Sequence, residues 1–277
     1  GTANFVNKYG VLPSKNKISL KEIKKILNYS RLKKINFLDS ACSYNNDKIL
    51  KDVKIENWNI VTKVNFKQAK KNYLLKAKKF LKINKFYGVL VHLKNTREIS
   101  SQKNYKLFQL LMKLKSKKII KKIGFSTYSS EDINLLIKKF NFDIIQCPVN
   151  ILDNRLIDNS LLKKLKKKNI EIHARSVFLQ GLLLKNYKNF PKEFKKFKTI
   201  FEDYENYVNN LQMSKLDVCL NYIRQIKEID KIVIGINNKK QLELIINSFN
   251  KKKTNLPKLI LRKKSNLYKL IDLRRWN

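Results

Sequence analysis

The sequence is poor in glycine, cysteine and histidine, and these shortages exclude several kinds of site. Its six glycines never form a Gly-x-Gly-x-x-Gly run after a candidate strand, so the phosphate-binding turn of an open nucleotide-binding sheet is missing. The three cysteines, Cys42, Cys147 and Cys219, are far apart and contain no Cys-x-x-Cys pair, which excludes a disulfide framework and a cysteine metal clip. The two histidines lack the spacing of metal ligands.

Long apolar runs are also missing. No stretch approaches the roughly 18–20 apolar residues that a membrane span needs, and the chain does not open on a basic–apolar–small leader. Hydrophobic residues still make up 43% of the chain, enough for a full core. We therefore expect a folded cytoplasmic protein.

Acidic residues are scarce: 21 Asp and Glu stand against 62 Lys and Arg, for a net charge of +41. Such an excess raises the question of a nucleic acid or anionic membrane partner. Only eight of the basic residues are arginine, the side chain that phosphate and base recognition favours. We interpret most of the charge as solvated surface lysine, with a polyanion interaction as the alternative.

Short apolar segments alternate with amphipathic helical segments along the chain, which predicts a parallel α/β sheet. The expected strands are Ile35–Leu38, Asn59–Thr62, Phe86–Val91, Lys122–Phe125, Phe142–Gln146, Ile170–Ala174 and Lys231–Ile234. The expected helices lie near 19–31, 67–82, 101–117, 130–140, 158–168 and 239–249, with one or two more in 192–226. No linker or composition break interrupts the pattern, so we expect one domain over 1–277, with 250–277 as an extension packing on it.

Four reactive side chains follow the ends of three consecutive strands. Asp39 ends the first, with Tyr44 five residues later, Lys63 ends the second and His92 ends the third. Each alone has a structural explanation, such as capping, packing or a satisfied core histidine. Together they favour a single-domain (β/α)8 barrel over an open sheet, because barrel active sites lie at the carboxyl ends of the strands.

These residues and their order resemble the aldo/keto reductase family over nearly the whole chain. The resemblance includes Asp39-Ser40-Ala41-Cys42-Ser43-Tyr44, Thr62-Lys63 and Leu90-Val91-His92. Farther along, it includes Gly124-Phe125-Ser126-Thr127-Tyr128, the strand around Gln146, Ala174-Arg175-Ser176-Val177-Phe178-Leu179-Gln180-Gly181, as in bacterial members, and Ile232-Val233-Ile234-Gly235 before Gln241. The opening Gly1-Thr2-Ala3 resembles the end of the family's first strand, so we expect a short N-terminal piece to be missing.

The resemblance implies reduction of an aldehyde or ketone by NAD(P)H, or the reverse oxidation of an alcohol. Tyr44 would be the general acid, Lys63 the cation that favours its phenolate, Asp39 the carboxylate that holds Lys63, and His92 the group that orients the substrate oxygen. A free tyrosine has a pKa near 10, so a neighbouring cation would bring it closer to neutral pH. No metal is implied.

The resemblance also implies a cofactor site. Ser126 and Gln146 would hold the nicotinamide carboxamide, while Thr127 stands where the family often has asparagine and Arg175 where it has a stacking aromatic. The remaining expected cofactor residues are Thr2, Ser176, Gly181, Gly235, Asn237, Lys239 and Gln241. Family habit and positive charge favour NADP; NAD is the alternative, since the usual clamp for the 2′-phosphate is absent.

Several alternatives stay open at this stage. The chain is either an active reductase, with a sugar-type substrate as one candidate, or a barrel that binds cofactor or polyanion without turnover. Arg155 either reaches the substrate mouth or pairs with Asp153. The tail 270–276 either packs over the barrel or borders the pocket, and His173 is interpreted as a packing residue inside its strand.

Overall fold

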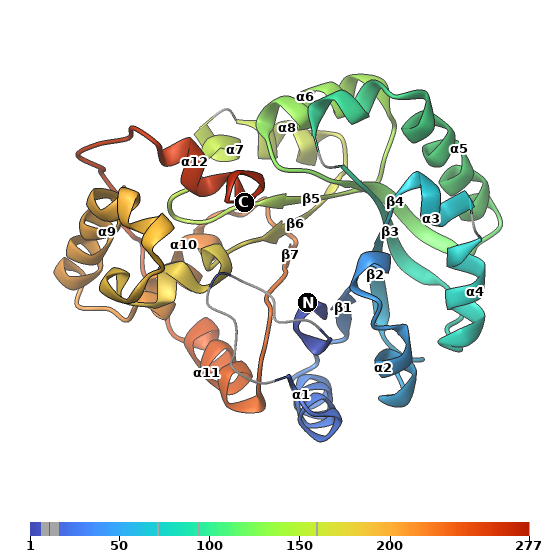
Figure 1. Cartoon of the computed structure of the whole chain (residues 1–277), viewed down its shortest axis with the longest axis horizontal. Coiled ribbons are helices and arrows are strands. Elements are labelled where there is room, and N and C mark those ends of the chain that lie inside the picture. The colour runs from blue at the N-terminus through green and yellow to red at the C-terminus, as the bar shows by residue number, and fades with distance from the viewer. Residues whose placement is uncertain (7–10, 12–16, 71, 94, 159, 277) are drawn as a thin grey trace.

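Seven parallel strands form one curled sheet in the computed structural model, which describes residues 1–6, 11, 17–70, 72–93, 95–158 and 160–276. Each strand pairs with the next in the chain, as in a barrel, and helices cover the outer side (Figure 1). The strands are β1 (Phe37–Asp39), β2 (Asn59–Val64), β3 (Phe86–His92), β4 (Ile120–Ser126), β5 (Ile144–Pro148), β6 (Glu171–Arg175) and β7 (Lys231–Ile232).

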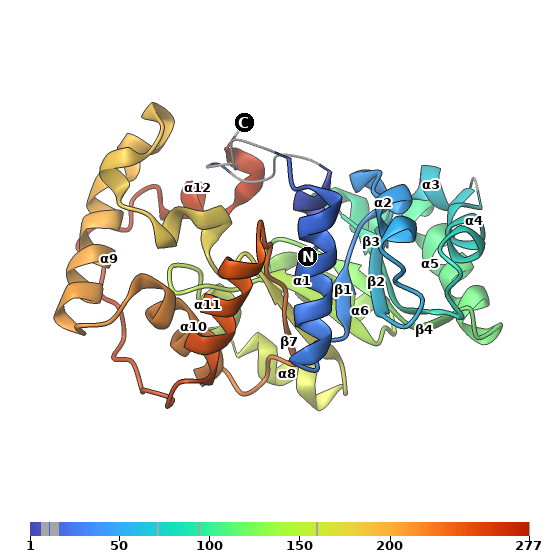
Figure 2. The same ribbon diagram turned by 90° about the horizontal axis from the view of Figure 1, so that it is seen from below.

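The first residues of the chain lie between the two ends of this sheet. The Gly1 amino group donates to the carbonyl of Ile234 just after β7 (2.9 Å), and the Thr2 N–H donates to the carbonyl of Asp39 in β1 (2.8 Å). Residues 1–2 thus occupy the position of a closing strand. The first and last barrel helices, α1 (Leu20–Leu32) and α11 (Lys239–Asn250), lie side by side across the same junction (Figure 2).

The remaining helices alternate with the strands, largely as the periodicity predicts. They are α2 (Asp47–Asp52), α3 (Phe66–Lys70), α4 (Tyr73–Phe80), α5 (Gln102–Ser116), α6 (Ser130–Lys139), α7 (Arg155–Asp158), α8 (Leu161–Lys167), α9 (Lys198–Asn210), α10 (Lys215–Gln225) and α12 (Leu267–Ile271). Two expected helices, 67–82 and 158–168, are interrupted. Asn72 and Ser160 have φ of 54° and 50°, a left-handed conformation that cannot continue an α-helix.

Strands β2, β5 and β6 are buried along almost their whole length, as expected for strands covered on both faces. The main core lies between the sheet and the helices and includes Ile60, Val89, Phe125, Ile145 and Ile172, none more than 2% exposed. A smaller cluster fills part of the barrel interior, where Val61, Leu90 and Ile144 meet.

Gly124 lies where β4 and β5 approach each other closely. A Cβ atom at this position would lie 1.7 Å from the carbonyl oxygen of Ile144. The position therefore accepts only glycine without moving the backbone of one of the two strands.

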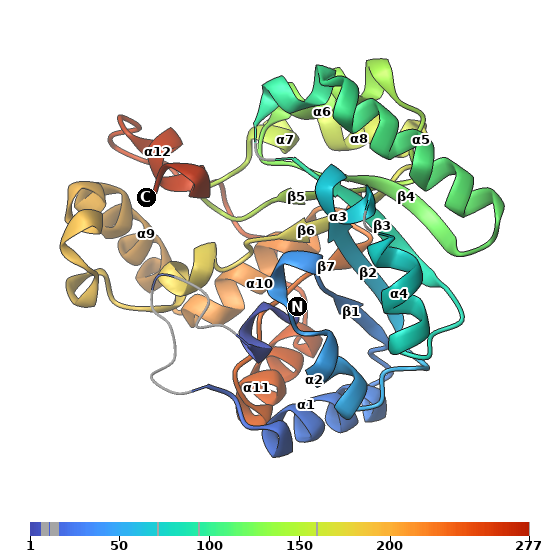
Figure 3. The ribbon, with the colours of Figure 1, turned by 45° about the vertical axis from the view of Figure 1, so that its right-hand side comes forward.

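A second apolar cluster lies beside the barrel and contains α9, α10 and the C-terminal segment. Phe194, Phe201 and Tyr204 pack there against Leu270 and Trp276. Figure 3 shows α9 and α12 on the side of the molecule away from α4 and α5. The extra helices expected in 192–226 are α9 and α10, and the C-terminal segment packs mainly on them. Within the described residues, no helix is long and apolar enough to cross a membrane.

Candidate active site

A buried ion pair lies at the carboxyl end of the barrel strands. The Lys63 Nζ atom of β2 lies 2.8 Å from both Asp39 carboxylate oxygens and donates a third hydrogen bond to the Ser40 carbonyl (2.8 Å). Gln146 of β5 donates from Nε2 to Asp39 Oδ1 (2.7 Å), so this bond links opposite sides of the barrel. The ammonium group and the amide hold the pKa of Asp39 below its ordinary value, although desolvation is the largest single influence and acts to raise it.

Tyr44 lies beside this pair on a short 3-10 turn, Cys42–Tyr44, that follows β1. Its ring centroid lies 5.5 Å from Lys63 Nζ, and the side chain is partly buried. Desolvation, and then the charge of Asp39, raise the pKa of Tyr44 above its ordinary value, while the charge of Arg175 acts to lower it.

Lys63 lies beside Tyr44, as expected, and its hydrogen bonds are made to other groups. An ammonium group has three N–H donors, and all three are directed to Asp39 and Ser40. The carboxylate also neutralises its charge. Lys63 Nζ thus lies 5.5 Å from the Tyr44 ring centroid without donating to the Tyr44 hydroxyl, and the charge of Arg175 also acts to lower the pKa of Tyr44.

His92 and Ser126 complete the same edge of the sheet. They end β3 and β4 and are paired in the strand register. His92 is partly buried, whereas Ser126 is 1% exposed. The four side chains predicted as the catalytic group thus come from neighbouring strand ends and the loop after β1, as the strand-end argument predicts.

Gln146 provides a test of whether these residues fit a nicotinamide cofactor. Its side chain is fully buried, and because Nε2 donates to Asp39, its Oε1 atom has no hydrogen-bond partner among the described residues. A buried acceptor without a donor is costly and calls for a partner. The amide N–H of a nicotinamide carboxamide has the required chemistry, so the donor set fits this group.

Two expected cofactor residues already use their hydroxyl groups. Thr2 is fully buried; its Oγ1 donates to the Asp39 carbonyl (3.0 Å) and accepts from Asn46 Nδ2 (2.9 Å). Thr127 is also fully buried and donates to Asp132 Oδ2 (2.5 Å). Both therefore support the walls of the site through neighbouring side chains. Asn46 and Asp132 were missed by sequence reasoning because their partners are distant or depend on the folded turn.

The segment after β6 has an unusual backbone. Ser176, Leu179, Gln180 and Gly181 have φ of 58°, 46°, 52° and 95°. A Cβ atom at Gly181 would meet nothing within 4 Å, so glycine is favoured there by backbone conformation and not by crowding. Ser176 and Gly181, both expected to line the cofactor path, thus lie on one sharply turning loop.

The expected cofactor residues after β7 form a separate group around the start of α11. The Gln241 Oε1 atom accepts from the Asn237 N–H (3.0 Å), and a Cβ atom at Gly235 would lie 3.5 Å from the Asn4 amide. Lys239 pairs through Nζ with Glu243 (2.8 Å). None of the three polar side chains has a recorded hydrogen bond to the Asp39 group.

The cap of α1 helps to fix this group. The Ser19 Oγ atom accepts a hydrogen bond from the Glu22 N–H (3.2 Å). The Glu22 carboxylate accepts from the Lys239 N–H (2.7 Å) at the start of α11. It therefore connects the first and last helices of the barrel.

Arg155 pairs with Asp153, one of its two expected roles, and the tail reaches the same loop as Arg155. Arg155 forms a two-pronged pair with the buried Asp153 (2.7 and 2.8 Å) and also donates to the Tyr128 carbonyl (3.3 Å). In the tail, Arg274 lies over the Tyr128 ring, with its guanidinium carbon 4.9 Å from the ring centroid. Both the residue and the tail therefore reach the β4–α6 loop.

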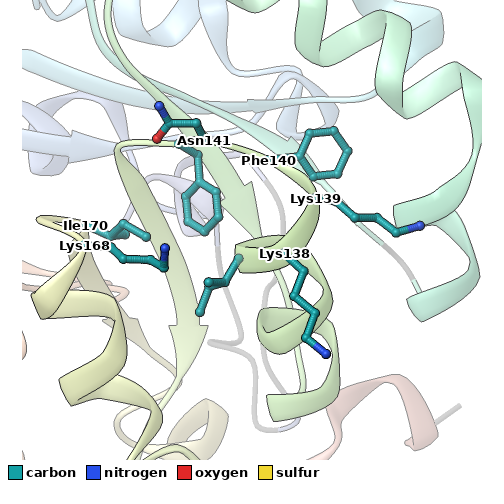
Figure 4. Close-up of a pocket in the computed structure, with 8 residues that line it drawn as sticks. Lys138, Lys139, Phe140, Asn141, Lys168 and Ile170 are labelled. Carbon is teal, nitrogen blue, oxygen red and sulfur yellow. The ribbon is translucent and has the colours of Figure 1, made fainter.

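Two surface hollows lie away from this site. One of about 450 Å³ is lined by Lys138, Phe140, Asn141 and Lys168, at the amino ends of β5 and β6 (Figure 4). Another of about 390 Å³ lies between α7–α8 and the segment 256–259. Barrel enzymes bind substrate at the carboxyl end of the strands, opposite the first hollow. The second hollow is lined by helices α7, α8 and α10 and the segment 256–259, and none of the predicted catalytic residues lines either hollow. Within the described residues, no group of three or more His, Cys, Asp or Glu side chains is arranged to hold a metal ion.

Comparisons with known proteins agree with this geometry. A sequence model of the Aldo/keto reductase family matches residues 1–256. No curated protein sequence matches the chain.

Solved structures share the fold at low sequence identity. The apo form of an aldo-keto reductase from Bacillus halodurans is 16% identical, with a TM-score of 0.68 over 91% of this chain and 87% of that one. A glycerol dehydrogenase from Gluconobacter oxydans is 15% identical, with a TM-score of 0.68 over 99% of this chain and 89% of that one. The predicted (β/α)8 barrel is therefore confirmed, and the chain belongs to the aldo/keto reductase family of NAD(P)-dependent oxidoreductases.

Proposed function

We propose that this protein reduces an aldehyde or ketone with a nicotinamide cofactor, with Tyr44 as the general acid. The observation that carries the proposal is the convergence of Asp39, Lys63 and Tyr44 at the carboxyl end of the barrel, with Lys63 Nζ 2.8 Å from the Asp39 carboxylate. A pair buried to this degree is expensive to desolvate. Its retention beside a partly buried tyrosine supports a chemical role.

The proton donated in the reaction comes from the Tyr44 hydroxyl. Its raised pKa keeps the phenol protonated near neutral pH, ready to donate to a carbonyl oxygen that gains negative charge. The positive charge of Arg175 acts to lower the pKa of Tyr44 and so assists the transfer. His92, on the neighbouring edge, orients the same substrate oxygen.

The residues that would hold the cofactor form two groups. Gln146 and Ser126 would bind the carboxamide, next to Arg175 and the loop that contains Ser176 and Gly181. A nicotinamide cofactor bound there supplies the hydride that reduces the carbonyl carbon. Lys63 and Asp39 act together as a fixed support, since their mutual bonds leave the tyrosine beside them little room to shift.

We assign the second cofactor group, Gly235, Asn237, Lys239 and Gln241, to the far end of the cofactor. NADP is favoured over NAD because the protein carries a large positive charge, which attracts the additional 2′-phosphate. The Lys239 side chain is 43% exposed and can exchange its partner Glu243 for a phosphate. A sugar-type carbonyl compound is the proposed substrate class.

Parallel titration with NADPH and NADH tests the proposal. Binding is followed by quenching of Trp58 and Trp276, or by calorimetric heat. Saturable binding of either supports it, and tighter binding of NADPH supports the NADP assignment. Failure of both to bind would contradict the proposed function, whatever the arrangement of the catalytic group.

A further inference from the structure

The side chain of Arg175 extends across the carboxyl end of the barrel. Arg175 ends β6, yet its Nη2 atom donates to the carbonyl of Thr127 (2.9 Å), which follows β4. Strand β5 lies between these two strands, and its Pro148 is the register partner of Arg175. The guanidinium group therefore lies over the carboxyl end of β5, at the same end of the barrel as the hydrogen bond between Gln146 and Asp39.

Arg175 differs from the other arginines near this mouth in its partners. Arg155 is paired with Asp153, and Arg274 and Arg275 both lie within 4.0 Å of Asp272. Arg175 donates only to neutral acceptors, the Thr127 carbonyl and Ser176 Oγ (3.2 Å). In the part of the chain that the structure describes, it forms no ion pair with a carboxylate.

Tyr128 provides a flat surface beside this guanidinium group. The Arg175 guanidinium carbon lies 4.3 Å from the centroid of the Tyr128 ring, and that of Arg274 lies 4.9 Å from the same centroid. Two guanidinium groups over one ring set up a positive region, and only Arg274 has a carboxylate partner to offset its charge. Nearby Asp132 is taken up by hydrogen bonds from Thr96 and Thr127 (2.5 Å each).

A partly buried guanidinium group without a counter-ion is unfavourable until an anion arrives. Its remaining N–H donors suit a carboxylate or phosphate, which it binds through two parallel hydrogen bonds. Arginine is rare in this chain, because lysine fills 54 of the 62 basic positions. Three of the arginines, Arg155, Arg175 and Arg274, nevertheless contact Tyr128.

We propose that Arg175 binds an anionic group, a carboxylate or phosphate, on the carbonyl substrate, so that the enzyme acts on acidic carbonyl compounds. This inference rests on the proposed function. A phosphate of the cofactor has the same chemistry as an acidic substrate, so the test must separate the two sources.

The test compares two alcohols that differ in charge and by one methyl group, 4-(hydroxymethyl)benzoate and its methyl ester. Each is titrated into the full-length protein saturated with NADPH, where an alcohol cannot react because the cofactor is already reduced. The measurement is made at about 0.15 M salt, which screens the general surface charge. The acid should bind about tenfold or more tightly than the ester, the gain of one charge-assisted contact.

Arg175→Met should bring the ratio of acid to ester affinity close to one, and Arg175→Lys should leave an intermediate ratio. The matched control is Arg31→Met, which removes one exposed arginine at the opposite end of the barrel, where it donates to the Lys54 carbonyl. This control should keep the full preference for the acid. Using a ratio removes any general effect of the substitutions on the fold.

Equal affinities for acid and ester in the wild-type protein, or a preference that Arg175→Met retains, would overturn the proposal. If that variant instead weakens NADPH binding about tenfold while wild type shows no acid preference, the anion is a cofactor phosphate, and the proposal is also wrong. Failure of wild type to bind NADPH or NADH would refute the proposed function, and this inference with it.

Discussion

At the scale of single residues, the site depends on how a few buried donors are used. Lys63 directs all three N–H groups to Asp39 and Ser40, and Gln146 adds a fourth hydrogen bond to the group. Positions of Asp39, Lys63, Tyr44 and His92 could be predicted because strand ends meet in a parallel barrel. That Lys63 uses all three of its N–H donors could not be predicted, since this depends on side-chain geometry that sequence spacing does not encode.

Replacing Lys63 by methionine should destabilise the protein by about 3–5 kcal/mol, because Asp39 keeps its charge while only 10% of its side chain is exposed. The free energy of unfolding in urea measures the loss. The double variant Lys63→Met/Asp39→Asn should recover part of it, since no charge is then left unpaired. An unchanged free energy in the single variant would contradict the importance assigned to this pair.

At the scale of elements, the sequence pattern predicts the order of strands and helices but not how neighbouring elements contact each other. The strand order and most helices follow from periodicity. The interruptions of two helices at Asn72 and Ser160 could not be predicted from periodicity. A polar residue at such a position is compatible with a helix interior as well as with the left-handed conformation seen here. The contact of Glu22 with Lys239 was also unpredictable, since it joins residues from opposite ends of the chain.

Gly124→Ala tests the close approach of β4 and β5. The new Cβ atom would overlap the Ile144 carbonyl, so we expect a loss of more than about 3 kcal/mol, or no soluble protein, as for severe overpacking. Gly88→Ala is the matched control, because its Cβ atom would lie 3.4–3.5 Å from side-chain atoms only. Thermal unfolding should separate the two variants clearly; equal melting temperatures would disprove the steric argument.

A polar cluster joins three strands near their amino ends. Glu171 of β6 accepts hydrogen bonds from Tyr87 of β3 (2.7 Å) and from Lys122 of β4, and His173 lies 2.7 Å from its other oxygen. Desolvation acts to raise the pKa of Glu171, but the bonds from His173, Lys122 and Tyr87 outweigh it and hold the pKa well below its ordinary value. His173 is thus buried inside its strand, as expected, and there it contacts the Glu171 carboxylate.

This depressed pKa predicts the sign of a pH effect. The stabilisation by the Glu171 carboxylate is fully present above the pKa of the unfolded chain, about 4.3, and is lost as the pH falls through the lower folded value. Glu171→Gln should therefore lower the melting temperature by several degrees at pH 7 and by less at pH 3. Glu243→Gln, at an exposed pair, is the control and should change little. A larger effect of Glu171→Gln at pH 3 would contradict the assignment.

At the scale of the whole molecule, the barrel brings together groups that lie about 100 residues apart in the sequence. Asp39 and Gln146 meet across its mouth, and Arg175 and the C-terminal Arg274 meet on Tyr128. The resemblance gave Asp39 and Gln146 separate roles and did not predict that they contact each other. It also left the position of the tail open. Long-range contacts of this kind depend on the closed sheet and cannot be derived from local patterns.

The central claim, that Tyr44 donates the proton in a carbonyl reduction, is tested most directly by the turnover of Tyr44→Phe with NADPH and an aldehyde that the wild-type enzyme reduces. The substitution removes only the hydroxyl group. We predict that kcat falls by about a hundredfold or more while the Kd for NADPH changes little. A variant that binds NADPH and keeps wild-type turnover would contradict the account.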